Sequence, residues 1–266
     1  MRAVLLLPLF VLMLGIAQAA SAQPFEEGLA AHRRGDDAAA LSIWRPIAQY
    51  GNAAAQFNLG LLYAAGKGVA QDHAEAVKWY RLAADQAYAP AQYNLGLMYA
   101  AGKGIGQDTA EAAKWYRLAA NQSHAPAQYN LGTMYHDGGK GVPQDYAEAR
   151  MWYRRAAAQG LASAQYSLGA MYRNGQGVAQ DYAEAMKWLR GAADQGHAAA
   201  KTVLGTMYSV GQGVPPDYVE AHMWFSLAVM DGDREAEQGL RVLEGMMTRA
   251  RIEEAQRRAA EWKPDR

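Results

Sequence analysis

A five-residue motif, which first reads Gln-Phe-Asn-Leu-Gly, recurs along this chain at an almost constant interval. Its complete copies begin at Gln56, Gln92, Gln128 and Gln165, and an altered fifth copy begins at Lys201. The intervals between them are 36, 36, 37 and 36 residues. A second series with the same period is formed by Trp79, Trp115, Trp152, Trp188 and Trp224. This period is typical of repeat proteins, in which consecutive copies of one supersecondary unit stack on each other.

Each unit is predicted to contain two helices, here called helix A and helix B, joined by a glycine loop. In the first unit we expect Gly60 on helix A to mark the closest approach of a neighbouring helix. Gly66 and Gly68 end helix A, because glycine readily adopts the left-handed conformation of a helix exit. Asp72 begins helix B with Glu75 three residues later, which is a capping-box pattern with Asp as the cap. The same Asp and Glu recur in all five units.

Helix B carries an apolar stripe at helical spacing. In the first unit this stripe is Ala76, Trp79, Tyr80, Ala83 and Ala84. A helical hairpin of this size cannot cover its own apolar face, so its stability must come from the hairpins beside it. The sequence therefore predicts an all-α solenoid of helix-loop-helix repeats with a period of 36–37 residues.

The repeats divide the chain into parts. Five repeats occupy 53–88, 89–124, 125–161, 162–197 and 198–233. Residues 23–52 are predicted to be a degenerate N-terminal repeat, because Asp36 and Ala40 match Asp72 and Ala76 at an offset of 36 residues. Residues 234–266 are predicted to form a helical C-terminal cap, with Thr248 as the N-cap of its second helix.

An apolar run at residues 1–22 predicts export. Arg2 precedes the run from Ala3 to Ile16, and small residues that fit a signal-peptidase site follow up to Ala22. The run is shorter than the roughly 20 residues that a membrane span needs. We therefore expect a signal peptide, a bacterial periplasmic or secreted protein, and no stable membrane insertion after cleavage.

Charge and composition exclude several classes of function. The 26 basic and 26 acidic residues cancel, so the chain lacks the basic excess typical of nucleic-acid binding. It contains no cysteine, which excludes a disulfide scaffold, a thiolate zinc site and a catalytic thiol. The six histidines show no metal-ligand spacing. His124 and His197 occupy the same position in their units, and we interpret that position as a packing site.

The repeat unit resembles the Sel-one-like repeat, a branch of the tetratricopeptide repeat superfamily with a longer, glycine-bearing loop between its helices. The resemblance rests on the motif AQxxLGxxYxxGxGVxxDxxEAxxWxxxAA and covers residues 53–233 closely. It implies a right-handed superhelix that acts as an adaptor and binds proteins or peptides along its concave surface. Bacterial members are often exported.

A partner is expected to contact the helix-A face. The candidate contact residues form three sets. The aromatic set is Phe57, Tyr93, Tyr129 and Tyr166. The amide set, suited to hydrogen-bonding an extended peptide, is Asn58, Asn94 and Asn130. The variable set, at the ends of two A helices, is His136, Asp137, Arg173 and Asn174. The alternative for the aromatic set is packing between adjacent A helices, and the variable set has the alternative of neutral surface variation.

The sequence predicts no catalytic, cofactor-binding or metal site. The stretch from Gly60 to Lys67 departs from the phosphate-loop pattern in spacing and lacks the Ser or Thr after the lysine. The common serine-hydrolase and zinc-protease motifs do not occur. We therefore expect a non-enzymatic scaffold that binds a protein or peptide. Two alternatives remain open, namely an extracytoplasmic enzyme with a nonstandard site and a structural or self-assembling envelope protein.

Overall fold

The computed structural model describes residues 23–264, and the predicted signal peptide at 1–22 lies outside them. Within the described part all regular secondary structure is helical, apart from one isolated bridge between Gly139 and Val142. The prediction of an all-α solenoid of paired helices is confirmed. Of the helices in residues 23–264, none combines the length and the apolar character needed to cross a bilayer.

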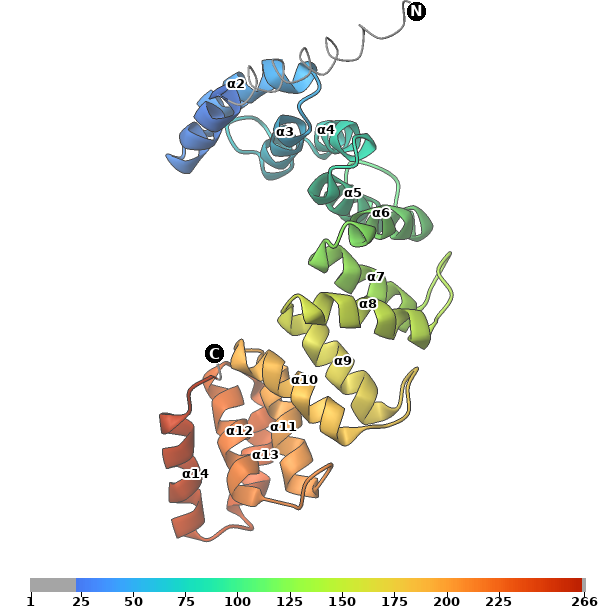
Figure 1. Cartoon of the computed structure of the whole chain (residues 1–266). Helices are drawn as coiled ribbons and strands as arrows, with labels where there is room; N and C mark the ends of the chain where they lie inside the picture. The colour runs from blue at the N-terminus through green and yellow to red at the C-terminus, as the bar shows by residue number, and fades with distance from the viewer. Residues whose placement is uncertain (1–22, 265–266) are drawn as a thin grey trace, which may run out of the picture. The chain divides into compact units, whose positions relative to one another are not determined.

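The first compact unit of the chain ends at His124. Its helices are coloured from blue to green in Figure 1. Its described part begins with a helical segment at residues 23–33. The helices that follow are α2 (Asp37–Gln49), α3 (Ala53–Ala65), α4 (His73–Asp85), α5 (Ala89–Ala101) and α6 (Thr109–Asn121). Each A helix, α3 or α5, packs against its own B helix, α4 or α6, and against the helix before it. The pairs therefore stack in sequential order.

The second compact unit begins at Ala125. Its helices are coloured from green to red in Figure 1. Its helices are α7 (Ala125–Asp137), α8 (Tyr146–Ala158), α9 (Ala162–Asn174), α10 (Tyr182–Asp194), α11 (Ala198–Val210), α12 (Tyr218–Met230), α13 (Arg234–Glu244) and α14 (Arg249–Glu261). The pairs α7 and α8, α9 and α10, and α11 and α12 stack in order. The two terminal helices, α13 and α14, both pack against α12.

The hydrophobic core lies between repeats. One cluster joins Ala76, Tyr80 and Ala83 of α4 to Leu95 of α5, which belongs to the next repeat. Trp115 of that next repeat packs against the same cluster. A second cluster joins α8 to α9 in the same way. A single hairpin consequently leaves part of its apolar surface exposed until its neighbour covers it, as the repeat architecture predicts.

Local signals in the sequence set the helix ends. Gly66 adopts φ 67° at the end of α3, and the side chain of Asp72 accepts a 2.9 Å hydrogen bond from the backbone N–H of Glu75 at the start of α4. Only this half of the predicted capping box forms. The Glu75 carboxylate instead accepts from Lys78 at 2.7 Å, and the Asp72 backbone N–H donates to the Tyr63 carbonyl at 2.9 Å. The cap is therefore tied to helix A of its own repeat. Thr248 begins α14 as predicted, but its side chain makes no capping bond.

Two glycine positions of the repeat serve tertiary contacts. A Cβ at Gly60 would lie 2.5 Å from the ring of Tyr80, so the close approach predicted there is made by helix B of the same repeat. Gly104 has φ +69°, and a Cβ on it would lie 2.2 Å from the carbonyl oxygen of His73. Gly104 therefore lets its loop rest on the first turn of the preceding B helix, a role that its sequence position did not reveal.

Buried glutamines connect successive repeats. Gln56 of α3 is 4% exposed; its Nε2 donates to the Ala48 carbonyl of α2 at 2.9 Å. Its Oε1 accepts a 2.7 Å bond from Nε2 of Gln86, at the end of α4. Gln165 and Gln195 repeat the side-chain pair at 2.8 Å. Each buried amide thus has both its donor and its acceptor used, which removes the cost of burying an unpaired polar group.

The fifth repeat replaces this amide pair with an ion pair. Lys201 occupies the glutamine position; its side chain is 4% exposed, and its Nζ donates to Asp231 Oδ2 at 2.5 Å. The ammonium also lies 4.8 Å from the centre of the Trp262 ring, just beyond α14. The departure seen at Lys201 in the sequence therefore marks the repeat that meets the terminal helices.

Asp231→Asn should destabilise the protein, because it leaves the buried Lys201 ammonium without a counter-charge. We expect a loss of about 2–3 kcal/mol, below the usual range for a fully buried pair because Asp231 is partly exposed. Urea unfolding followed by circular dichroism measures this loss. The double variant Lys201→Gln with Asp231→Gln restores the amide pair of the other repeats and should lie within about 1 kcal/mol of the parent. Equal stability of Asp231→Asn and the parent would contradict the argument.

Candidate functional site

The aromatic residues of the A helices are half-buried against helix B of their own repeat. Ring centres are 5.9 Å apart for Phe57 and Tyr80, and 5.8 Å apart for Tyr93 and Tyr116. Tyr129 and Tyr153 are 5.6 Å apart. Burial raises the pKa of Tyr153 to about 12. One face of each aromatic ring in these pairs is therefore occupied by packing within the repeat.

A second ring often covers the same aromatic residue from the position just before the next A helix. Phe57 lies 5.5 Å from Tyr88, Tyr93 lies 4.9 Å from His124, and Tyr166 stacks on His197 at 4.7 Å. Burial lowers the pKa of both histidines, which favours neutral imidazole. Their geometry is that of packing residues. Within residues 23–264 no group of three or more His, Cys, Asp or Glu side chains is placed to hold a metal ion.

The amide set has a different environment. Asn58, Asn94 and Asn130 are half-buried, and their side chains form no hydrogen bond with other groups of residues 23–264. This contrasts with the buried glutamine two positions earlier in each repeat, whose donor and acceptor are both used. The asparagine amides consequently keep a donor and an acceptor available to solvent or to a ligand.

An exposed leucine adjoins this amide set in the first compact unit, which ends at His124. Leu61 is one helical turn after Asn58 on α3, and 40% of its surface is exposed. The corresponding Leu97 on α5 is half-buried. Sequence reasoning missed both leucines, although their positions outside the buried stripe of helix A were the available signal. Each A helix of the first unit thus offers an apolar side chain beside a free amide.

The variable set lies at the ends of α7 and α9. His136 Nδ1 is 2.8 Å from Asp137 Oδ1, and its ring packs edge-on against Tyr146 with centres 5.3 Å apart. Arg173 Nε donates to Gln212 Oε1 in the loop of the following repeat at 2.9 Å. Asn174 is exposed directly before the capping glycine. His136 and Arg173 are therefore engaged in local contacts, whereas Asn174 and Asp137 are exposed, the latter with one carboxylate oxygen next to His136.

A serine and a histidine also meet on α12. His222 is 1% exposed, and its Nδ1 lies 3.2 Å from Ser226 Oγ. Its Nε2 lies 3.5 Å from Glu244 Oε1 of α13, which is long for a hydrogen bond. Ser226 is inside a helix, where the backbone N–H groups are already bonded and none is left to stabilise an oxyanion. These three side chains are best described as a polar contact between α12 and α13.

A family model now accounts for the repeated geometry. The Sel1 repeat model matches residues 53–88, 89–124, 125–161, 162–197 and 198–233. The chain belongs to the Sel1 repeat family. This confirms the resemblance noted in the sequence, with five repeats in the chain.

Two solved structures of Sel1 repeat proteins are similar over most of the chain. One is c5321, a protective antigen of uropathogenic Escherichia coli, with 36% identity, a TM-score of 0.81 and 91% of this chain covered. The chain spans only 53% of the length of c5321. The other is a Sel1 repeat protein of Oxalobacter formigenes, with 35% identity, a TM-score of 0.75, and coverage of 90% of this chain and 96% of that one. A search of curated proteins gives no significant match.

Proposed function

We propose that this Sel1 repeat protein is an exported, non-enzymatic scaffold that binds an extended segment of a partner protein on its helix-A face. The observation that carries the proposal is the free amide at the same position of successive A helices, at Asn58 and Asn94. An extended peptide offers a backbone donor and acceptor at regular intervals, and an amide side chain pairs with both. Leu61, beside Asn58, supplies apolar contact to the same ligand.

The aromatic set contributes to this surface in a secondary way. Phe57 and Tyr93 have one ring face packed within the repeat, which holds their rings in place. Their half-buried state leaves a rigid edge beside the amides. A rigid aromatic edge adds contact area at little entropic cost, because the side chain is already ordered in the free protein. Asp137 and Asn174 provide exposed polar groups at the corresponding ends of α7 and α9 in the second unit.

Site-specific photo-crosslinking in the native compartment tests the proposed surface. A benzophenone amino acid replaces Asn58, Leu61 or Asn94 in turn, and the adduct is identified by mass spectrometry. We expect one common partner from these positions. The matched control is the same amino acid at the exposed loop positions Lys67 and Lys103, which should not yield that partner. Adducts from the loop positions and none from the A helices would contradict the proposal.

The double variant Asn58→Ala with Asn94→Ala should weaken binding of the crosslinked partner segment by about tenfold or more, because each amide loses its hydrogen bonds to the ligand. Its free energy of unfolding should change by no more than about 0.5 kcal/mol, since neither amide bonds within the described chain. Isothermal titration calorimetry and urea unfolding measure the two quantities. Unchanged affinity with unchanged stability would refute the role of the amides.

Export is supported by the signal-like sequence at residues 1–22, and similarity to a protective antigen fits an extracytoplasmic location.

The two alternative functions, a self-assembling envelope protein and an enzyme with a nonstandard site, predict different results. A self-assembling envelope protein would grow in mass with concentration in light scattering, whereas the scaffold should keep one mass. An enzyme would turn over glycan or ester substrates, whereas the purified scaffold should not.

A further inference from the structure

Helix α8 of the central repeat differs in charge from the other B helices. It carries Arg150, Arg154 and Arg155 with a single acidic residue, Glu148. The corresponding helices α4 and α10 each carry two basic and two acidic residues. Where α4 has Val77, Leu82 and Asp85, α8 has Arg150, Arg155 and Ala158. Two of these changes add a positive charge and the third removes a negative one. Met151 in place of Lys78 removes one positive charge, so α8 is more positive than α4 by two charges.

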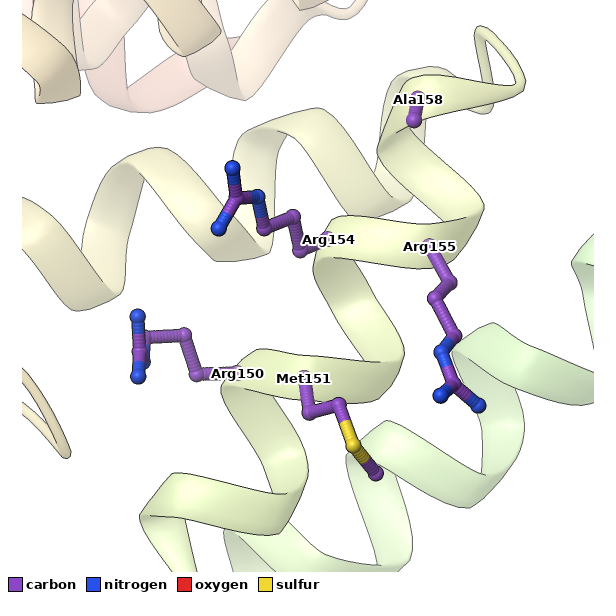
Figure 2. Close-up of a pocket in the computed structure, with 5 residues that line it drawn as sticks. All are labelled: Arg150, Met151, Arg154, Arg155 and Ala158. Atoms are coloured by element: carbon purple, nitrogen blue, oxygen red, sulfur yellow. The ribbon is translucent and has the colours of Figure 1, made fainter.

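The changed residues line a hollow of about 360 Å³ on the surface of α8, formed by Arg150, Met151, Arg154, Arg155 and Ala158. Figure 2 shows Arg150 and Arg154 pointing to one side of the helix and Arg155 to the other. Met151 lies between Arg150 and Arg155 in this view, and Ala158 follows at the end of the helix (Figure 2). The hollow therefore has an apolar floor and a basic wall on each side.

Arg154 lacks the bond that the equivalent arginine makes in two other repeats. Arg81 of α4 donates to the hydroxyl of Tyr99 in the next A helix at 2.5 Å, and Arg190 of α10 donates to Tyr208 in the same way. Arg154 occupies the same position and makes no such bond. Within residues 23–264, neither Arg154 nor Arg155 forms an ion pair.

Two further observations on Arg150 and Arg155 favour an anionic ligand. Nε of Arg150 is shielded from solvent and has no hydrogen-bond partner within the described residues. The Arg155 guanidinium lies 4.6 Å from the centre of the Trp152 ring, which holds it in position without neutralising its charge. A guanidinium that has no counter-charge and is partly shielded from water binds a carboxylate strongly, because it can donate two parallel hydrogen bonds to it.

We propose that this hollow is a second binding site, for an acidic segment of a partner protein in which an apolar side chain is flanked by Asp or Glu. The apolar side chain lies on Met151 and Ala158, and the carboxylates pair with the arginines on both walls. The apolar floor favours such a segment over a nucleic acid, which would need a longer basic track along its phosphates. The narrow, hollowed surface of one helix likewise favours a side chain over a flat lipid surface.

This site is separate from the helix-A face. It uses the surface of a B helix and no residue of the amide or aromatic sets. The result of its test therefore leaves the proposed scaffold function untouched, and the crosslinking experiment above leaves this proposal untouched.

Fluorescence anisotropy with a defined probe tests the proposal. The probe is a labelled peptide of about twelve residues in which single leucines alternate with pairs of glutamates, titrated with the full chain. We expect saturable binding that weakens as salt is raised, because carboxylate–guanidinium pairs are screened. A peptide with glutamine in place of glutamate should bind at least about tenfold more weakly.

The matched variant gives α8 three of the residues of α4, through Arg150→Val, Arg155→Leu and Ala158→Asp. These residues already occur at the same positions of a folded repeat, so the variant should keep the unfolding midpoint of the parent. We expect it to bind the acidic probe at least about tenfold more weakly. The control Arg249→Gln with Arg251→Gln removes two exposed charges from α14 and should leave binding unchanged.

Three outcomes would overturn the proposal. The first is equal binding by the parent and the α8 variant, and the second is an equal loss in the α14 control, which would indicate only a general charge effect. The third is a parent that ignores the acidic peptide but binds a single-stranded oligonucleotide or vesicles of anionic phospholipid. A variant that loses its fold would be replaced by Arg155→Leu alone, for which the same comparison applies.

Discussion

Trp152→Ala should lower the free energy of unfolding by about 3–5 kcal/mol. Trp152 lies in the central repeat and is 3% exposed, so truncation to alanine removes a large apolar surface from the core. The change also deletes the 3.1 Å bond from Trp152 Nε1 to Glu148 and uncovers the Arg155 guanidinium. Because successive hairpins depend on each other for burial, the loss should appear in the main unfolding transition in urea.

The control for Trp152 is Lys140→Ala in the exposed loop of the same repeat. Lys140 makes no ion pair within residues 23–264, and a surface change of this kind normally alters stability by less than about 0.5 kcal/mol. A small effect of equal size for both variants would show that Trp152 is not part of the core.

Gly104→Ala should lower the free energy of unfolding by about 2–5 kcal/mol, the second-largest effect that we expect. Its φ of +69° disfavours any residue with a Cβ, and the new methyl group would lie 2.2 Å from the His73 carbonyl oxygen. The neighbouring atom belongs to the backbone of α4, so relief requires the two repeats to move apart. The expected value combines left-handed strain with overpacking. Urea unfolding measures it.

Gly102→Ala separates these two contributions. Gly102 is in the same loop with φ +65°, but its nearest neighbour, Gln107 Cβ, would lie 3.1 Å from the new methyl group. It shares the backbone strain and lacks the contact with the preceding repeat. We expect a loss of about 1–2 kcal/mol for Gly102→Ala. Equal losses of stability in the two variants would mean that the loop at Gly104 does not pack tightly against α4.

The periodic features of the fold were predictable because they depend on local chemistry. Asp72 caps its helix with its own side chain, and Gly66 ends a helix through its own backbone freedom. These interactions need only a few neighbouring residues. A period of 36–37 residues then predicts stacking, since each hairpin repeats the same exposed apolar stripe.

The partners of individual side chains were less predictable. Glu75 has the position of a capping-box residue, yet it pairs with Lys78, because the Asp72 N–H is already bonded to Tyr63. Likewise, Phe57 was placed correctly on helix A, but its packing against Tyr80 and Tyr88 depends on the angle between two helices. The periodicity of the sequence predicts which face of a helix a residue occupies. It does not predict which residue of the neighbouring helix contacts that residue.

The candidate sites likewise divide into features that the sequence predicts and features that depend on neighbouring helices. The free amides at Asn58 and Asn94 were identified from their position, since a polar residue off the buried stripe of a helix must face outward. The hollow on α8 was not identified, although its arginines are visible in the sequence. Arg154 makes no bond like the one from Arg81 to Tyr99, although Tyr172 stands at the equivalent position of the next repeat, so the sequence does not reveal the difference.

The sequence by itself determined the helix ends and the residues on each helix face, because these follow from backbone preferences and from hydrophobic spacing within a few turns. It also determined the repeat length and the family, because the same motif recurs every 36–37 residues. Only the tertiary structure decided which buried polar groups are paired, as with Gln56 and Gln86 or Lys201 and Asp231, and which charged groups remain unpaired, as on α8. The physical reason is that pairing depends on the positions, to within a few tenths of an ångström, of side chains that come from different helices. Such positions are fixed by how the hairpins pack and not by the spacing of residues along the chain.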